Sequence, residues 1–537
     1  MNGCRNFPVK SAIWLIAVSG VFFASAPKAS AQIYQFYWKD NANNGNWDWG
    51  SSQWYSTQTN GNVGSPNYNG GEQLYFENTG NTTTTINSGG GTGGAPSGWI
   101  GLNAIFTQNA SASKVYTVNS GTGINGIYLF NKIETLNIGT AAGLVINSAI
   151  QLGSATNEIN AVAADIQLGA LDLNGKILNS YGNKNLQITG VVSGSGTYKI
   201  QNQGISVTYS GAGANTFTGD TTVKNTSSLI LNKSANTAAI AGFLTIDSGA
   251  VVRADAVNQL NNQLVTVNGT LNLNNNSQST ALAGSGAVTL GSATLTINNT
   301  ASDTFGGVVS GSGSVVKTGV GKQIFNGNND YTGTTTVNTG VLEINGNQTS
   351  ATGNVTVNAK LTGTGTIGGA TTISASGTLA PTAQASGSKM TIGSTVDFAS
   401  GSIFEWDLNA ATADPGINAS NQGTYGQLAA TGAATGTSVF TIVLGTNGYA
   451  DAFWNTNKSW TNVFVASGLA SLNTLFTTFS GTGLTATGSG ATAIATAAGE
   501  GHFSFSGTTL QWTAVPEPTS TLAGLLLAAG LLRRRRD

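Results

Sequence analysis

Short runs in which apolar and polar residues alternate recur along the chain between its two ends. Clear examples are Thr221-Thr222-Val223-Lys224, Leu264-Val265-Thr266-Val267, Ala293-Thr294-Leu295-Thr296-Ile297 and Val355-Thr356-Val357. Alternation with a period of two predicts short β-strands, and the Asn- and Gly-rich segments between the runs predict turns. Gly, Thr, Asn and Ser are poor helix formers, so long helices are not expected between the ends. The pattern therefore predicts an all-β protein.

Two blocks of the sequence, 190–231 and 307–346, repeat the same order of motifs. Strands this short cannot bury a core alone, but units stacked coil on coil share one continuous core. We therefore expect a right-handed parallel β-helix in which successive coils lie about 4.8 Å apart. Inward Val, Ile and Leu would form rows, Asn and Thr would form ladders at the turns, and glycines would occupy tight corners.

The block at 307–346 resembles the autotransporter-associated β-strand repeat, whose pattern is G-x-G-x-x-x-K-x-G, then Y-x-G-x-T-x-V, then G-x-L. The matching residues are Gly311, Gly313, Lys317, Gly319, Tyr331, Gly333, Thr335, Val337, Gly340 and Leu342. In the earlier block Phe217 stands where Tyr331 does, and the K-x-G is missing. The resemblance covers about half of the chain and implies a fold and an export class, not an activity. Autotransporters end in a membrane β-barrel, and this chain ends differently, so we do not expect it to translocate itself.

The first residues predict a signal peptide over 1–31. Arg5 and Lys10 precede the apolar segment 12–24, and Ala29-Ser30-Ala31 is a small-residue cleavage site before Gln32. Signal peptidase is therefore an expected partner. Cys4, the one cysteine, lies before the apolar segment, so disulfides, thiolate metal sites and cysteine nucleophiles are not expected in the processed protein.

The last residues predict a sorting signal over 515–537. The tetrad Val515, Pro516, Glu517 and Pro518 precedes an apolar run, 519–532, and a cluster of arginines, 533–536. The run predicts a short hydrophobic helix, although it is shorter than the roughly 20 residues of a membrane span. The segment resembles the PEP-CTERM signal of Gram-negative bacteria. That resemblance implies processing by an exosortase, transient association with the inner membrane, and delivery to the cell surface or outside the cell.

Charge is sparse, at 8% of residues, against about 25% in typical soluble domains. Seven of the 21 basic residues lie in the end segments expected to be removed, but only Asp537 of the 22 acidic residues surely does. The processed body is therefore acidic, and we expect no nucleic-acid partner.

The body divides into three parts: 32–100, 101–394 and 395–514. The first is aromatic-rich and is interpreted as an N-terminal cap on a β-solenoid over 101–394, and the third as a β-rich C-terminal cap. A sharper interpretation of the first part is a sugar-stacking surface, because aromatic rings suit the apolar faces of sugars. Its residues would be Trp38, Trp47, Trp49 and Trp54.

Candidate chemistry is scarce, and no catalytic, cofactor-binding or metal-binding residue is predicted. Glu405 and Asp407, two apart on one strand, could form the carboxylate pair of a glycosidase, but more simply form a solvent face beside Trp406. Arg253 is expected to pair with Asp255 at the surface, and His502 is a lone histidine. The turn at 328–330 could bind Ca²⁺ only weakly, because the G-G-x-G-x-D array is absent.

These observations favour an exported, exosortase-sorted protein of the cell surface or extracellular matrix with a structural or adhesive role and no catalysis. Extracellular polysaccharide is the partner that such a low-charge, hydroxyl-rich rod would meet. The alternative is a carbohydrate-active enzyme, a polysaccharide lyase or a glycosidase, or a carbohydrate-binding protein on the same fold.

Overall fold

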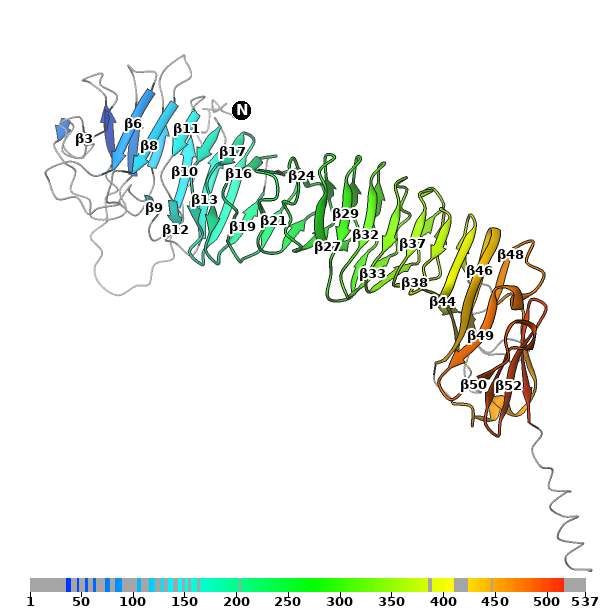
Figure 1. The fold of residues 1–537 in the computed structure, drawn as a ribbon. Coiled ribbons are helices and arrows are strands. Elements are labelled where there is room, and N and C mark those ends of the chain that lie inside the picture. Colours follow the sequence, from blue (N-terminus) through cyan, green and yellow to red (C-terminus); the bar gives the residue numbers. More distant parts are fainter. Residues whose placement is uncertain are drawn as a thin grey trace, which may run out of the picture.

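The structure is a computed structural model. It describes residues 165–515 apart from 202–203, 385–388, 410–423 and 446–447, and the backbone of the strands between 35 and 161. Strands predominate in this part of the chain (Figure 1), and helical turns are limited to three short 3-10 segments, Ala452–Asn455, Leu472–Thr474 and Gly490–Thr492. The all-β prediction is confirmed. The short helix expected over 519–532 and the signal peptide over 1–31 lie outside the described residues.

Along the coils, the strands pair in parallel with strands of the neighbouring coils. In one ladder, β32 (Ser314–Lys317) pairs with β34 (Thr335–Val337), β34 with β37 (Val355–Val357), and β37 with β40 (Thr371–Ile373). The coils lie side by side along a rod in Figure 1. The expected parallel β-helix is confirmed. Parallel pairing of these short strands stabilises them because every coil supplies hydrogen-bond partners to the next.

The later coils have three faces, of which the ladder from β32 to β40 forms the first. The second contains β33 (Lys322–Phe325), β35 (Val341–Ile344), β38 (Lys360–Gly363) and β41 (Thr378–Pro381). The third contains β36 (Asn347–Gln348), β39 (Thr366–Ile367) and β43 (Met390–Ile392). β44 (Val396–Asn409) pairs along the first and second faces, and β46 (Leu428–Leu444) pairs along all three.

The earlier coils follow the same plan with a different sheet beside the first face. It includes β20 (Ser206–Gly211), β22 (Ser228–Lys233), β24 (Val251–Ala254), β26 (Thr270–Asn272), β28 (Ala287–Thr289) and β31 (Val308–Ser310). The first face continues through β19 (Thr197–Ile200), β21 (Thr221–Val223), β23 (Leu244–Ile246), β25 (Leu264–Val267), β27 (Gln278–Gly284) and β29 (Thr294–Ile297).

Inward side chains form rows along the axis, as alternation predicts. Ile297, Val337, Val357 and Ile373 occupy one register row and are fully buried. Full burial of such an aliphatic side chain contributes about 1.5–3 kcal/mol. Lys317 occupies the same row, between Ile297 and Val337, and is equally buried. This row is therefore apolar except for one buried lysine in its middle.

Glycines form a column at one corner of the coils. A Cβ on Gly307 would lie 1.7 Å from the carbonyl oxygen of Gly286, and one on Gly327 would lie 1.7 Å from that of Gly307. Gly346 continues the column, with the Gly327 oxygen 2.0 Å from its position for a Cβ. These glycines are required by the close approach of neighbouring coils and not by a left-handed backbone.

Parallel pairing extends beyond the boundaries expected for the solenoid at residues 101 and 394. On the N-terminal side, β1 (Gln35–Lys39) pairs in parallel with β5 (Gln73–Glu77), and β5 with β7 (Ala104–Thr107). On the C-terminal side, β44 and β46 continue the coils to β49 (Phe476–Gly481). The segments 32–100 and 395–514 are thus not caps throughout, because their longer or more aromatic strands still join the parallel ladder.

The part of the C-terminal segment outside the ladder is a five-stranded antiparallel sheet. Its order is β47 (Lys458–Trp460), β53 (Thr509–Ala514), β52 (Gly501–Ser506), β51 (Ile494–Ala497) and β50 (Thr485–Thr487). Trp512 Nε1 donates to the Trp454 carbonyl at 2.8 Å. Trp460 packs edge-on against Trp406 of the solenoid at 5.1 Å between ring centroids. Aromatic contacts therefore join this sheet to the last coils. The sheet itself lies at the red end of the ribbon in Figure 1.

Among the described residues, no helix combines the length and the apolar character needed to cross a membrane.

Candidate functional surface

The repeat motif at 307–346 builds the interior of two successive coils, because β32 and β33 of the motif pair with its later strands β34 and β35. Tyr331 is buried, and its hydroxyl lies 2.5 Å from Thr335 Oγ1. Lys317 Nζ donates to the carbonyl oxygens of Gly319 and Thr339. Burial lowers the pKa of Lys317 to about 8 and raises that of Tyr331 to about 12. The motif residues thus satisfy one another inside the coils and present no reactive group to solvent.

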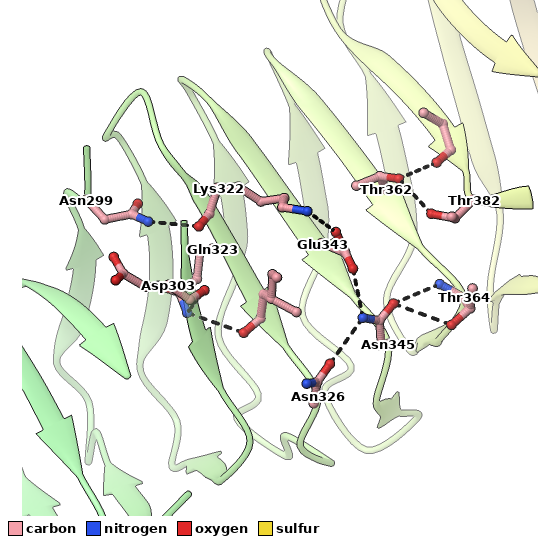
Figure 2. Close-up of polar contacts among 12 residues, drawn as sticks. Asn299, Asp303, Lys322, Gln323, Asn326, Glu343, Asn345, Thr362, Thr364 and Thr382 are labelled. Atoms are coloured by element: carbon pink, nitrogen blue, oxygen red, sulfur yellow. Dashed lines mark hydrogen bonds and ion pairs between the residues drawn. The ribbon is translucent and has the colours of Figure 1, made fainter. Parts of the chain in front are cut away.

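The second face carries a network of charged and amide side chains that links successive coils (Figure 2). Lys322 Nζ donates to Glu343 Oε2 at 2.8 Å, and Asn345 Nδ2 donates to Glu343 Oε1 at 2.9 Å. Asn345 also donates to Asn326 Oδ1 and accepts from Thr364. Burial alone would raise the pKa of Glu343, but the hydrogen bonds from Lys322 and Asn345 lower it below its usual value. We call this the charged face.

The charged face continues to Glu405 and Asp407 on β44. Both point outward, because Trp406 between them is fully buried. Glu405 accepts from Lys360 Nζ at 2.6 Å, and Asp407 accepts from the Ala383 amide at 3.3 Å. Burial raises the pKa of Asp407, and the charge of Glu405 adds to that rise. The two carboxylates therefore point outward, as the solvent-face interpretation expects, and they make contacts between coils.

The other side chains considered for catalysis or metal binding lie in structural positions. Arg253 pairs with Asp255 through two hydrogen bonds of 2.7 Å, which confirms the expected surface pair. His502 lies on β52, partly exposed, between the buried Gly501 and Phe503. No group of three or more His, Cys, Asp or Glu side chains that could hold a metal ion occurs in the described part of the chain. In the turn at 328–330, Asn329 is buried and accepts from the Val309 amide at 2.8 Å.

The first face presents a row of threonines over its later coils. Thr296, Val316, Thr336, Thr356 and Thr372 occupy one register row. The residues on either side of each are buried, so these side chains point outward. We call this row, with its flanking polar side chains, the threonine face. No outward side chain of β29, β32, β34, β37 or β40 is charged.

The sorting and sugar-stacking candidates lie mostly outside the described residues. Val515 is the last described residue and is 50% exposed. The other residues of these candidates lie outside the described part of the chain: Pro516, Glu517 and Pro518 of the sorting motif, Ala29, Ala31 and Gln32 of the cleavage site, and Trp49. Trp38 and Trp54 occupy paired positions on the antiparallel strands β1 and β3 (Trp54–Ser56), and Trp47 lies on β2 (Asn46–Trp47). These candidates remain predictions.

Sequence reasoning missed the threonine face and the buried lysines. Lys317 could have been placed inside by alternation, because Val315 is inward and Val316 outward. Lys233 is also buried, and its Nζ donates to the carbonyls of Gly190 and Ser210. The threonine row carries a weaker signal, since its members are separated by loops of varying length and align only once the register is known.

These features define a class: a parallel β-solenoid resembling the passenger region of autotransporters. The family model for the Passenger-associated-transport-repeat matches residues 315–344, a segment that includes Lys317 and Tyr331. The chain is similar to the adhesin BmaC autotransporter of Brucella suis biovar 1 (strain 1330), with 45% identity over 102 residues. That alignment covers 18% of this chain and 3% of the relative, so the chain spans only a small part of that protein's length.

Proposed function

We propose that this protein is a structural or adhesive rod displayed on the cell surface or in the extracellular matrix. The observation that carries the proposal is the solenoid itself, in which the carboxylates considered for catalysis, Glu405 and Asp407, make contacts between coils. The matched repeat and the similarity to an adhesin support the same role. A stiff, low-charge rod holds its ends apart and offers long lateral faces, which suits adhesion.

We further propose that export uses the signal peptide over 1–31 and that an exosortase recognises Pro516-Glu517-Pro518. The tail sequence supports this route. The relative is named an autotransporter, which points to a different route, so the experiment must separate the two. In the source bacterium, replacing the three residues by alanine should abolish surface labelling and leave the protein in the inner-membrane fraction. Surface labelling that persists in this variant, or in a strain without exosortase, would contradict the sorting proposal.

The adhesive role has its own test. A deletion strain should adhere less to surfaces and build less matrix, and the wild-type chain supplied in trans should restore both. Unchanged adherence and matrix would overturn the role.

The rival function is a carbohydrate-active enzyme, and Glu405 with Asp407 is the pair that favours it. Purified protein incubated with polysaccharides should release no reducing sugar and no unsaturated product. Release that disappears in both Glu405→Gln and Asp407→Asn, with the fold intact by circular dichroism, would establish the rival. The third candidate, sugar binding by Trp38, Trp47, Trp49 and Trp54, predicts tryptophan fluorescence quenching by sugars.

A further inference from the structure

The threonine face exposes hydroxyl groups that the fold leaves unused. Successive coils place the members of the central row about 4.8 Å apart. Within the described part of the chain, the hydroxyls of Thr296, Thr336, Thr356 and Thr372 make no side-chain hydrogen bond, although they share one register row. Val316, which has the same branched shape, is the single interruption.

The flanking columns behave differently because they are satisfied internally. Asn358 Nδ2 donates to Asn338 Oδ1 at 2.9 Å, and Ser374 Oγ donates to Asn358 Oδ1 at 2.5 Å. On the other side, Thr334 Oγ1 donates to Ser314 Oγ at 3.2 Å. These axial hydrogen bonds hold the margins of the face in place. The central hydroxyls are thus fixed in a straight row by the solenoid and by the stiff χ1 of threonine.

Charge limits what can lie on this face. Its outward side chains are neutral, whereas the same face on earlier coils carries the Lys224–Asp247 pair at 4.0 Å, and its row ends at the exposed Asp397. An anionic polymer gains no attraction here and is repelled by the acidic body. A protein partner would need apolar or aromatic anchors, and the outward positions of these five strands offer only Val316.

Shape favours a long ligand over a small one. Each hydroxyl contributes one modest hydrogen bond, so useful affinity requires several in series. The row runs across five coils along the rod axis. An extended chain that itself repeats hydroxyl groups can engage several members of the row at once.

We propose that the threonine face is a docking surface for an uncharged polysaccharide lying along the rod. This inference rests on the proposed adhesive role and names the partner class and the face. Preformed, rigid hydroxyls reduce the ordering entropy of binding, which compensates for the weakness of each contact. Binding by this face should be insensitive to salt, because no ion pair forms.

The test uses the full processed chain with cellulose, dextran and a galactomannan as neutral probes and polygalacturonate as an anionic probe. Co-sedimentation and affinity electrophoresis measure binding. The double variant Thr336→Val with Thr356→Val removes two hydroxyls and keeps the side-chain shape. It should weaken binding to the bound neutral probe about fivefold to a hundredfold, from the usual range of net hydrogen-bond contributions.

The matched control is Thr208→Val with Thr378→Val, which removes outward hydroxyls on β20 and β41, on other faces. It should bind like the wild type. The proposal is overturned if no neutral probe binds, if both double variants bind equally, or if polygalacturonate binds more tightly. It is also overturned if the wild type self-associates in sedimentation velocity and the first double variant does not, since the partner would then be a second copy. Loss of adherence in the deletion strain without glycan binding would leave the adhesive role standing and refute this face alone.

Discussion

Gly307→Ala should separate two neighbouring coils, whereas Gly306→Ala should not. The new methyl carbon at 307 would lie 1.7 Å from the Gly286 oxygen, although real Cβ contacts below 3.0 Å essentially do not occur, so the coils must part by about 1.3 Å. At the exposed Gly306 the nearest atom is the Gly284 oxygen at 3.8 Å, an ordinary contact. Because the two glycines are adjacent in the sequence, comparing the two variants separates the cost of close packing between coils from the general effect of replacing a glycine.

The magnitude follows from what the displacement disrupts. The hydrogen bonds from Val308 N to Gly286 O (3.1 Å) and from Gly306 N to Gly284 O (2.7 Å) join the same coils. Losing both costs about 1–3 kcal/mol, and overpacking adds about 1–3 kcal/mol. Gly307→Ala should therefore destabilise this coil interface by about 2–6 kcal/mol. Gly306→Ala should be neutral or slightly stabilising, by up to about 1 kcal/mol.

Hydrogen exchange followed by mass spectrometry suits this prediction, because a solenoid opens locally and a single unfolding midpoint averages over its coils. Peptides that cover β28 and β31, which pair across this interface, should lose protection in Gly307→Ala and keep it in Gly306→Ala. Equal protection in the two variants would refute the argument that close approach at the corner, and not the chemistry of glycine in general, maintains the column.

Three further predictions concern buried and exposed polar groups. The pKa of Lys317 is about 8 in the folded protein and 10.5 when unfolded. Between these two pH values the unfolded chain binds more protons than the folded one. The free energy of unfolding should therefore rise with pH from about 8 to about 10. Urea unfolding of Lys317→Met should show a smaller rise, and an unchanged slope would contradict the assignment. Tyr331→Phe leaves the Thr335 hydroxyl buried without its partner and should cost about 1–3 kcal/mol. Adding Thr335→Val should recover much of that loss, and a double variant no better than the single would argue against the pair. Arg253→Ala removes an exposed ion pair and should change the free energy of unfolding by less than about 1 kcal/mol; a larger loss would mean that the arginine packs as well as pairs.

The coil architecture could be predicted because its signals are local. Alternation within runs such as 293–297 gives strands, and a buried aromatic residue four positions before a threonine recurs, as Phe217 with Thr221 and as Tyr331 with Thr335. The less similar block at 190–231 keeps the same buried position, because Phe217 is buried like Tyr331, but it supplies no hydroxyl to Thr221.

The limits of the solenoid and its lateral faces could not be predicted in the same way. Strands β44 and β46 are longer and more aromatic than those of the middle coils, so composition suggested a separate domain where the ladder continues. Which threonines share a row depends on the lengths of three loops in each coil. The register of parallel pairing, and not any local pattern, sets that alignment.

The antiparallel sheet at the C-terminal end has a consequence for the end-to-end assembly of one rod on another. Phe505 of β52 stacks on Phe479 at 4.6 Å between centroids and contacts Phe440 and Phe476 of the last coils. It closes the end of the aliphatic core with a strand direction that the coils cannot continue. Because every coil is a template for the next, an uncovered terminal coil would recruit another rod. The sheet thus blocks end-to-end addition of a second rod at this end, where uncovered coils would otherwise assemble into a fibre.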